Sequence, residues 1–177
     1  MRPVFKETHT TMEKKFNEFK TYALVTGAAS GMGRIYTLRL AERGYNIIAV
    51  DINAKGLEET EQMVKAQIEA SGEIRPEHKA AFRMLRIQQD LSVMEAADKI
   101  YETTEAEGCV VEVLVNNAGV MYCQGIAETS ERMLKLIMMV HMHTPLMIYY
   151  SAAFHDLQFI LIRFCAFAQP IWMPHSV

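Results

Sequence analysis

Three glycines in one short stretch, at positions 27, 31 and 33, have the spacing most suggestive of chemistry in this chain. They separate an apolar run, residues 22–26, from a segment with helical apolar spacing that reaches Gly44. A strand, a glycine turn and a helix in this order bring unpaired backbone N–H groups and the positive end of a helix dipole together. Such a junction suits a diphosphate, so the stretch predicts a nucleotide-binding turn.

Each residue of this turn has an expected role. Gly27 would make the tight turn, Gly31 would let the backbone approach a phosphate, and Gly33 would let the helix pack closely on the strand. Thr26 and Ser30 add hydroxyl groups at the end of the strand and in the turn. The spacing, Gly-x-x-x-Gly-x-Gly, differs from the Gly-x-Gly-x-x-Gly of the general dinucleotide fold. The candidate cofactor-binding residues of the turn are Thr26, Gly27, Ser30, Gly31, Met32 and Gly33.

A second apolar run, residues 46–50, ends in Asp51 and completes a strand, helix and strand unit. Asp51 follows the glycines by about 20 residues, where a carboxylate can accept hydrogen bonds from the ribose hydroxyls of adenosine. It would also repel a 2′-phosphate, and no basic residue comes before Lys55. We therefore expect NAD in preference to NADP, with Asp51 and Ile52 as binding residues. The alternative for Asp51 is a solvated carboxylate at a strand end.

A further apolar run, residues 111–115, ends in Asn116-Asn117-Ala118-Gly119. With the glycine turn, it makes the chain resemble the short-chain dehydrogenase/reductase family, whose cofactor turn is Thr-Gly-x-x-x-Gly-x-Gly and whose fourth strand ends Asn-Asn-Ala-Gly. The resemblance implies that these four residues shape the floor of the cofactor site and bond back toward the first strand near Thr26. Asn117, Ala118 and Gly119 are therefore cofactor-binding candidates. Without the resemblance, they would be an ordinary Asn/Gly turn.

The segment between these motifs continues the alternation of helix and strand. Residues 57–70 have one apolar face and predict a helix, and residues 73–79 predict a surface loop because they hold a proline and mixed charges. A third strand, residues 82–88, precedes Asp90 and Leu91. In the family an acidic residue here hydrogen-bonds the adenine amino group, so the resemblance implies that Asp90 and Leu91 line the adenine pocket. Their alternative is to cap the helix expected over residues 93–106.

The order of these elements predicts an α/β fold, a three-layer doubly wound parallel sheet of the Rossmann type, incomplete on its C-terminal side. We expect one such domain over residues 21–177. Residues 1–20 would form a leader or a short amphipathic helix with Phe16 and Phe19 facing inward.

Composition excludes other classes of protein. The net charge of -3 gives no attraction for nucleic acid. Charged and histidine residues interrupt each apolar stretch of the last third of the chain, so we expect no membrane insertion. The cysteines, Cys109, Cys123 and Cys165, lack metal-ligand spacing and suit free thiols in a cytoplasmic protein. We expect no metal site.

The catalytic residues of the family are not recognisable in this sequence. In the family, a serine ends the fifth strand and a Tyr-x-x-x-Lys helix supplies the general acid or base. Here no tyrosine has a lysine four residues downstream, and the strand expected within residues 157–168 has no serine at its end. Tyr149 and Tyr150 are expected to be core or interface aromatics. His141 stands where the family has an asparagine that holds a relay water, and it could relay protons or pack against backbone.

Three hypotheses follow for the function. The first is an NAD(P)-dependent short-chain oxidoreductase that transfers hydride between nicotinamide and a small carbonyl or alcohol substrate, inactive here because we expect truncation before the catalytic segment. The second is a non-catalytic NAD-binding or partner-binding module, and the third is a product without function. A truncated sheet would expose apolar surface, so self-association or a homo-oligomer is expected.

Overall fold

A parallel sheet forms the centre of the molecule. The computed structural model describes residues 16–121, 128–152 and 159–162. Within these residues the sheet has five strands, all parallel, in the order β3-β2-β1-β4-β5. The strands are β1 Tyr22–Thr26, β2 Asn46–Asp51, β3 Met84–Gln88, β4 Val111–Asn116 and β5 Phe159–Ile162. The order reverses between β1 and β4, which confirms the predicted doubly wound α/β fold.

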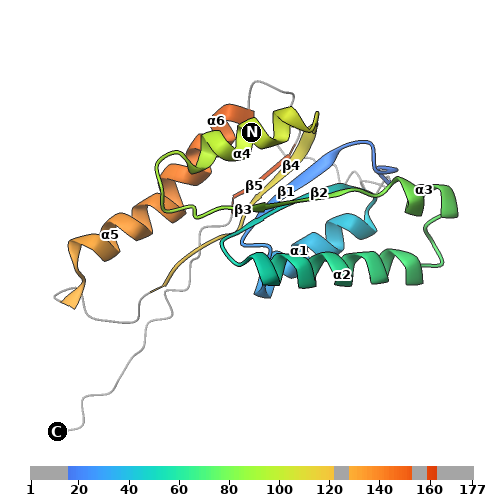
Figure 1. The fold of residues 1–177 in the computed structure, drawn as a ribbon, viewed down its shortest axis with the longest axis horizontal. Coiled ribbons are helices and arrows are strands. Elements are labelled where there is room, and N and C mark those ends of the chain that lie inside the picture. Colours follow the sequence, from blue (N-terminus) through green and yellow to red (C-terminus); the bar gives the residue numbers. More distant parts are fainter. Residues whose placement is uncertain (1–15, 122–127, 153–158, 163–177) are drawn as a thin grey trace, which may run out of the picture.

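Helices cover both faces of this sheet and make three layers (Figure 1). They are α1 Gly31–Glu42, α2 Ala54–Ala70, α3 Pro76–Ala81, α4 Ala96–Ala106, α5 Glu131–Met138, the π-helical turn η2 Met139–His143 and α6 Thr144–Ala152. Figure 1 shows α1 and α2 on one face and α4 and α6 on the other, while α5 extends past the strand ends. The carboxyl ends of the strands thus lie between α5 and the start of α1.

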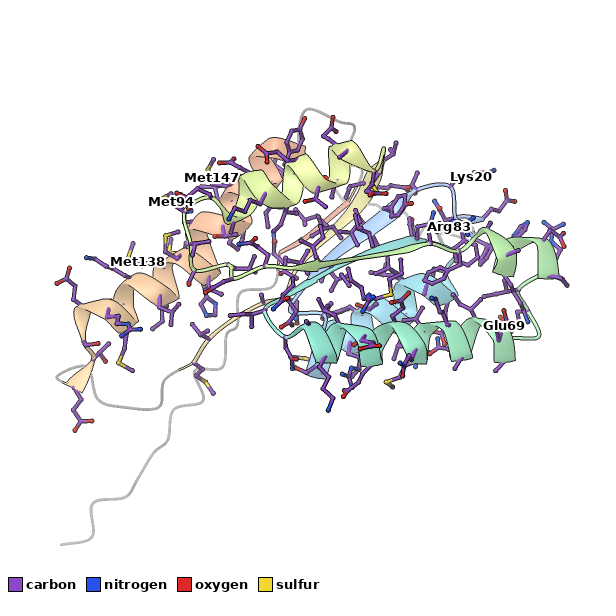
Figure 2. All side chains as sticks on the ribbon, viewed as in Figure 1. Lys20, Glu69, Arg83, Met94, Met138 and Met147 are labelled. Atoms are coloured by element: carbon purple, nitrogen blue, oxygen red, sulfur yellow. The ribbon has the colours of Figure 1, made fainter. Side chains whose placement is uncertain are left out.

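The apolar core lies on both sides of the sheet because successive strand residues point to opposite faces. Ala23 and Val25 of β1 belong to the cluster under α1 and α2. Leu24, between them, belongs to the cluster under α4 and α6. Side chains fill both spaces between sheet and helices (Figure 2). Burial on both faces explains why the strands read as continuous apolar runs.

The expected surface loop over residues 73–79 is wrong in part, because α3 begins there at Pro76. Proline has its φ fixed near the helical value and lacks only an N–H that the first helical position leaves unpaired. Glu77 adds a negative charge to the first turn of the helix, where the dipole favours it. Proline therefore marked the start of a helix here rather than a loop.

The N-terminal segment, expected to be a leader or a short helix, is described only from residue 16. Residues 1–15 lie outside the described residues, and residues 16–20 form a turn rather than a helix. Glu18 and Phe19 have positive φ values of 62° and 57°, which a helix does not allow. Phe19 is buried, as predicted, and Phe16 packs against the same cluster. The turn is fixed by Asn17, whose Oδ1 accepts the N–H groups of Lys20 and Thr21 at 3.0 Å.

Candidate cofactor site

An open cleft of about 810 Å³ lies at the carboxyl edge of the sheet. Its walls are the glycine turn after β1, the ends of β2 and β3, the turn after β4, and one side of α5. Most of the residues predicted from the sequence line it together: Gly27, Ser30, Gly31, Met32, Asp51, Ile52, Asp90, Leu91, Asn117, Ala118 and Gly119. Thr26 and Gly33, also predicted, do not line the cleft and support the turn from behind.

The glycines of the turn after β1 have different spatial needs. Gly27 and Gly31 have φ values of +68° and +51°, which favour glycine. A Cβ on Gly27 would lie 2.8 Å from Asn117 Nδ2, and one on Gly33 would overlap the carbonyl oxygen of Gly27. A Cβ on Gly31 would meet no atom of the described residues within 4 Å. Packing therefore requires Gly27 and Gly33, while Gly31 leaves the backbone open at the start of α1, as a bound phosphate would need.

Thr26 joins the two turns that flank the cleft. Its Oγ1 accepts hydrogen bonds from the backbone N–H groups of Asn117 and Ala118, both at 3.0 Å. Asn117 Nδ2 donates to the Thr26 carbonyl oxygen at 3.0 Å. Thr26 is buried, so the loss of its hydroxyl would leave these two N–H groups without their partner. The contact is the one that the resemblance implied, between the Asn-Asn-Ala-Gly turn and the end of the first strand.

Asp51 connects the ends of β1 and β2. Its Oδ2 accepts the N–H of Ala29 at 3.0 Å, and its Oδ1 accepts the N–H of Asn53 at 2.9 Å. The carboxylate is half-buried and lines the cleft, so it is not simply a solvated strand-end group. A carboxylate has about four acceptor positions, which leaves capacity for a ligand hydroxyl.

Asp90 and Leu91 line the cleft beyond β3 but do not cap a helix. Asp90 Oδ1 accepts the N–H of Ser92 at 2.8 Å within a turn. The helix begins at Ala96 rather than residue 93, with Glu95 at its N-cap position. The alternative of helix capping is therefore wrong for these residues. Leu91 is buried, and its carbonyl oxygen accepts the Thr144 hydroxyl at 2.8 Å, which ties this wall to α6.

His141 lies in η2 and contacts the turn after β4. Its Nε2 is 3.0 Å from the Val120 nitrogen and 2.8 Å from the Val120 oxygen. One tautomer accepts the N–H and the other donates to the carbonyl. The ring also packs on Gly119, where a Cβ would lie 2.7 Å from Cε1. Of the two roles expected for His141, these contacts match packing against the backbone. A role in proton relay stays a prediction.

Sequence reasoning missed the wall that α5 contributes. Arg132, Lys135 and Leu136 line the cleft from this helix, and Met139 and Val140 continue the wall in η2. Lys135 Nζ pairs with Glu131 Oε1 at 2.6 Å. Their spacing in the sequence could have shown that these three α5 residues lie on one face, because residues three and four apart are neighbours on a helix. Nothing in the sequence showed that this face would turn toward the glycine turn.

The described residues were also expected to hold no metal site and no membrane span. Among the described residues, no three histidine, cysteine, aspartate or glutamate side chains gather as a metal site would require. In the part of the chain that the structure covers, no helix is both long and apolar enough to cross a bilayer. Tyr149 packs against the core under α4, whereas the side chain of Tyr150 and residues Cys123 and Cys165 lie outside the described parts.

The sequence and fold match known proteins. The family model for short chain dehydrogenase matches residues 21–156. Retinol dehydrogenase 10 from Xenopus tropicalis is 30% identical over 132 residues, which cover 68% of this chain and 39% of that protein. Very-long-chain 3-oxoacyl-CoA reductase from Eremothecium gossypii is 32% identical over 146 residues, which cover 79% of this chain and 37% of that protein.

A solved structure shows the same fold. The structure of 3-oxoacyl (acyl-carrier-protein) reductase from Agrobacterium tumefaciens C58 with NADP bound has a TM-score of 0.65 and 21% identity. The match covers 84% of this chain and 52% of that one. The chain thus spans about two fifths of the length of the two curated relatives and about half of the solved structure.

Proposed function

The chain belongs to the short-chain dehydrogenase family, and from this premise we propose that it binds a nicotinamide dinucleotide in the cleft at the carboxyl edge of its sheet. The observation that carries the proposal is the open backbone at Gly31, which begins α1 inside the cleft. The first N–H groups of a helix and its dipole attract an anion, and the glycine lets the backbone approach it. The diphosphate would lie there.

The other cleft residues would contact the remaining parts of the cofactor. Asp51 would accept the ribose hydroxyls of adenosine, and Ile52, Asp90 and Leu91 would border the adenine. Asn117, Ala118 and Gly119 would form the floor. Residues 21–177 would make one domain around this site. When bound, the nicotinamide supplies the hydride acceptor or donor, and the protein supplies its orientation.

We propose NAD rather than NADP as the preferred cofactor. Asp51 supports this, because its carboxylate lines the cleft and would repel a 2′-phosphate. The cations that line the described cleft, Arg132 and Lys135, come from α5 rather than from the turn after β2. The Agrobacterium relative has NADP bound, so the preference rests on Asp51 and its neighbours and not on the comparison.

For the whole protein we propose oxidoreductase activity on a carbonyl or alcohol, as the names of the relatives suggest. A non-catalytic NAD-binding module is the second candidate. It needs only the cleft that the structure describes at the carboxyl edge of the sheet. A hydride-transfer assay that follows NADH absorbance with a panel of small carbonyl compounds separates the two. Turnover supports the oxidoreductase, and saturable binding without turnover supports the module.

The cofactor preference is tested by calorimetric titration of the purified chain with NAD and with NADP. We expect NAD to bind at least about tenfold more tightly, a difference of about 1.4 kcal/mol. Asp51→Asn, which keeps one acceptor oxygen but removes the charge, should bring the two dissociation constants together. Asp98→Asn removes an exposed aspartate from the first turn of α4 and serves as the control. Equal affinities in the wild-type chain would contradict the preference.

A further inference from the structure

Arg34 folds back from α1 onto the outside of the glycine turn. It follows Gly33 directly, and its Nε donates to Thr60 Oγ1 at 2.9 Å. Its Nη2 donates to the Ala29 carbonyl oxygen and lies 3.3 Å from the Gly56 carbonyl oxygen. Glu59 Oε2, at 3.2 Å from the same nitrogen, balances the charge. One guanidinium therefore joins the glycine turn to the first turns of α2, through the planar fork that lysine lacks.

Thr60 completes this junction from α2. Its buried Oγ1 accepts from Arg34 and lies 3.0 Å from the Ala28 carbonyl oxygen and 2.8 Å from that of Gly56. The hydroxyl has one proton, which it can give to either carbonyl. Thr60 thus contacts the glycine turn both directly and through Arg34. Thr60 has no exposed surface, so its hydroxyl is bonded to protein groups and not to bulk water.

The junction is also tight where it has no hydrogen bonds. A Cβ on Gly56 would lie 2.8 Å from the Ala29 Cβ and 3.0 Å from the Ala29 oxygen. The start of α2 therefore packs directly on the residue whose carbonyl Arg34 holds.

These contacts fix the orientation of two successive peptide planes. A trans peptide is planar, so its C=O and its N–H point in opposite directions. The plane between Ala28 and Ala29 is held on both sides, since Thr60 contacts its oxygen and Asp51 accepts its N–H. The plane between Ala29 and Ser30 has its oxygen held by Arg34, so the Ser30 N–H points away from α2.

The side away from α2 is the cleft. Ser30 and Gly31 line the cleft, whereas Arg34, Gly56 and Thr60 do not. Holding the carbonyls on one side therefore aims the following amide toward the side where the diphosphate would lie.

We propose that Arg34 and Thr60 are positioning residues that preorganise the phosphate-binding turn before the cofactor arrives. The inference deepens the proposed function and rests on it for the identity of the ligand. Without the two side chains, the Ala28 and Ala29 peptides could rotate, and ordering them would oppose binding. The same bonds keep the guanidinium out of the cleft, so it is not offered to a 2′-phosphate.

The first test needs no ligand. Amide hydrogen exchange is measured over residues 28–33 of the free, full-length chain for Arg34→Gln and Thr60→Val. Exchange should be at least about tenfold faster than in the wild type, because local opening is what the junction prevents. The milder variants Arg34→Lys and Thr60→Ser keep a charge or a hydroxyl at the same place. Thr60→Ser should restore slow exchange, and Arg34→Lys should restore it only in part.

Two matched controls separate the junction from general effects. Arg39→Gln removes an exposed arginine of α1 that pairs with Glu42 at 2.9 Å. Thr104→Val removes a buried hydroxyl whose bond is to Tyr101, within α4. Both should leave exchange over residues 28–33 unchanged. Unchanged exchange in Arg34→Gln and Thr60→Val as well would overturn the proposal.

The second test uses two fragments of the ligand. ADP-ribose contains the diphosphate and adenosine does not. In Arg34→Gln and Thr60→Val, the dissociation constant of ADP-ribose should rise about tenfold relative to wild type, and that of adenosine should not change. A merely structural role would weaken both or neither, and either result would overturn the proposal. If the wild-type chain binds neither fragment, the proposed cofactor function fails, and the exchange experiment still decides whether the junction orders the turn.

Discussion

The strand order reverses between β1 and β4 and divides the sheet into two halves. The halves differ in how their polar groups are hydrogen-bonded. Around β1 and β2, Asp51, Thr60 and Arg34 tie the glycine turn to its neighbours on several sides. Around β4, Asn116 Oδ1 and His143 Nδ1 are buried and have no hydrogen-bond partner among the residues that the structure describes. The first half forms a polar network around the glycine turn. In the second half, one of these two groups, His143 Nδ1, lies in the π-helical turn η2.

The outer surface of the second half carries a row of exposed apolar side chains. Leu134, Met138, Met142 and Leu146 recur every four residues along α5, η2 and α6, and each is more than half exposed. Figure 2 labels Met138 on α5. From this difference in hydrogen bonding we expect the turn between β1 and α1 to be the most rigid part of the cofactor site. Substitutions there should cost the most free energy of unfolding, and those on the α5 surface the least.

Gly33→Ala should give the largest effect on stability. The new Cβ would overlap the Gly27 carbonyl oxygen, so the turn or the helix must shift. We expect the free energy of unfolding to fall by about 3 kcal/mol or more, measured by chemical denaturation. Gly72→Ala, where a Cβ meets nothing within 4 Å, is the control. An equal loss in the two variants would show that the turn is not the rigid part.

His141→Leu should give a smaller loss in the second half. It removes the partner of the Val120 N–H or C=O, which we expect to cost about 1 to 2 kcal/mol in the free energy of unfolding. His141→Asn, with a shorter side chain that has both a donor and an acceptor, should recover part of it. Chemical denaturation of both variants is the measurement. A leucine variant as stable as the wild type would mean that the contact between His141 and Val120 does not stabilise the fold.

Met138→Gln should change the free energy of unfolding least, within about 0.5 kcal/mol, because its side chain is mostly exposed. Val140→Gln, two residues away but buried, is the contrasting variant and should be clearly destabilising. If the chain self-associates, as expected from its apolar surface, Met138→Gln should weaken that association in size-exclusion chromatography. A large loss of stability in the Met138 variant would show that the α5 surface is packed rather than exposed.

The sequence allowed the first half to be predicted well, because its signals are local. Glycine spacing, apolar runs and Asp51 at a strand end all act within one strand, helix and strand unit. The junction of Arg34 with Thr60 was not predictable in this way. The two residues are 26 positions apart, and either would be ordinary on the exposed face of a helix. Their contact exists only because α1 and α2 pack side by side.

The second half was harder to predict for a related reason. Asn116 to Gly119 gave a recognisable motif, but the π-helical turn at His141 has no periodic signal of its own. The cleft wall of Arg132 and Lys135 depends on how α5 is turned, which is set by contacts and not by local sequence. Pro76 was misread because proline occurs both in loops and at the first position of helices.

The central claim, that the backbone at Gly31 binds a diphosphate, is tested most directly by NAD titration of a matched pair of glycine variants. Gly31 and Gly108 both have positive φ, +51° and +62°, and within the part of the chain that the structure describes a Cβ on either meets nothing within 4 Å. Alanine should therefore introduce similar backbone strain at both sites. We predict that wild-type and Gly108→Ala chains bind NAD alike and that Gly31→Ala loses measurable binding. Equal NAD affinity in all three chains would contradict the account.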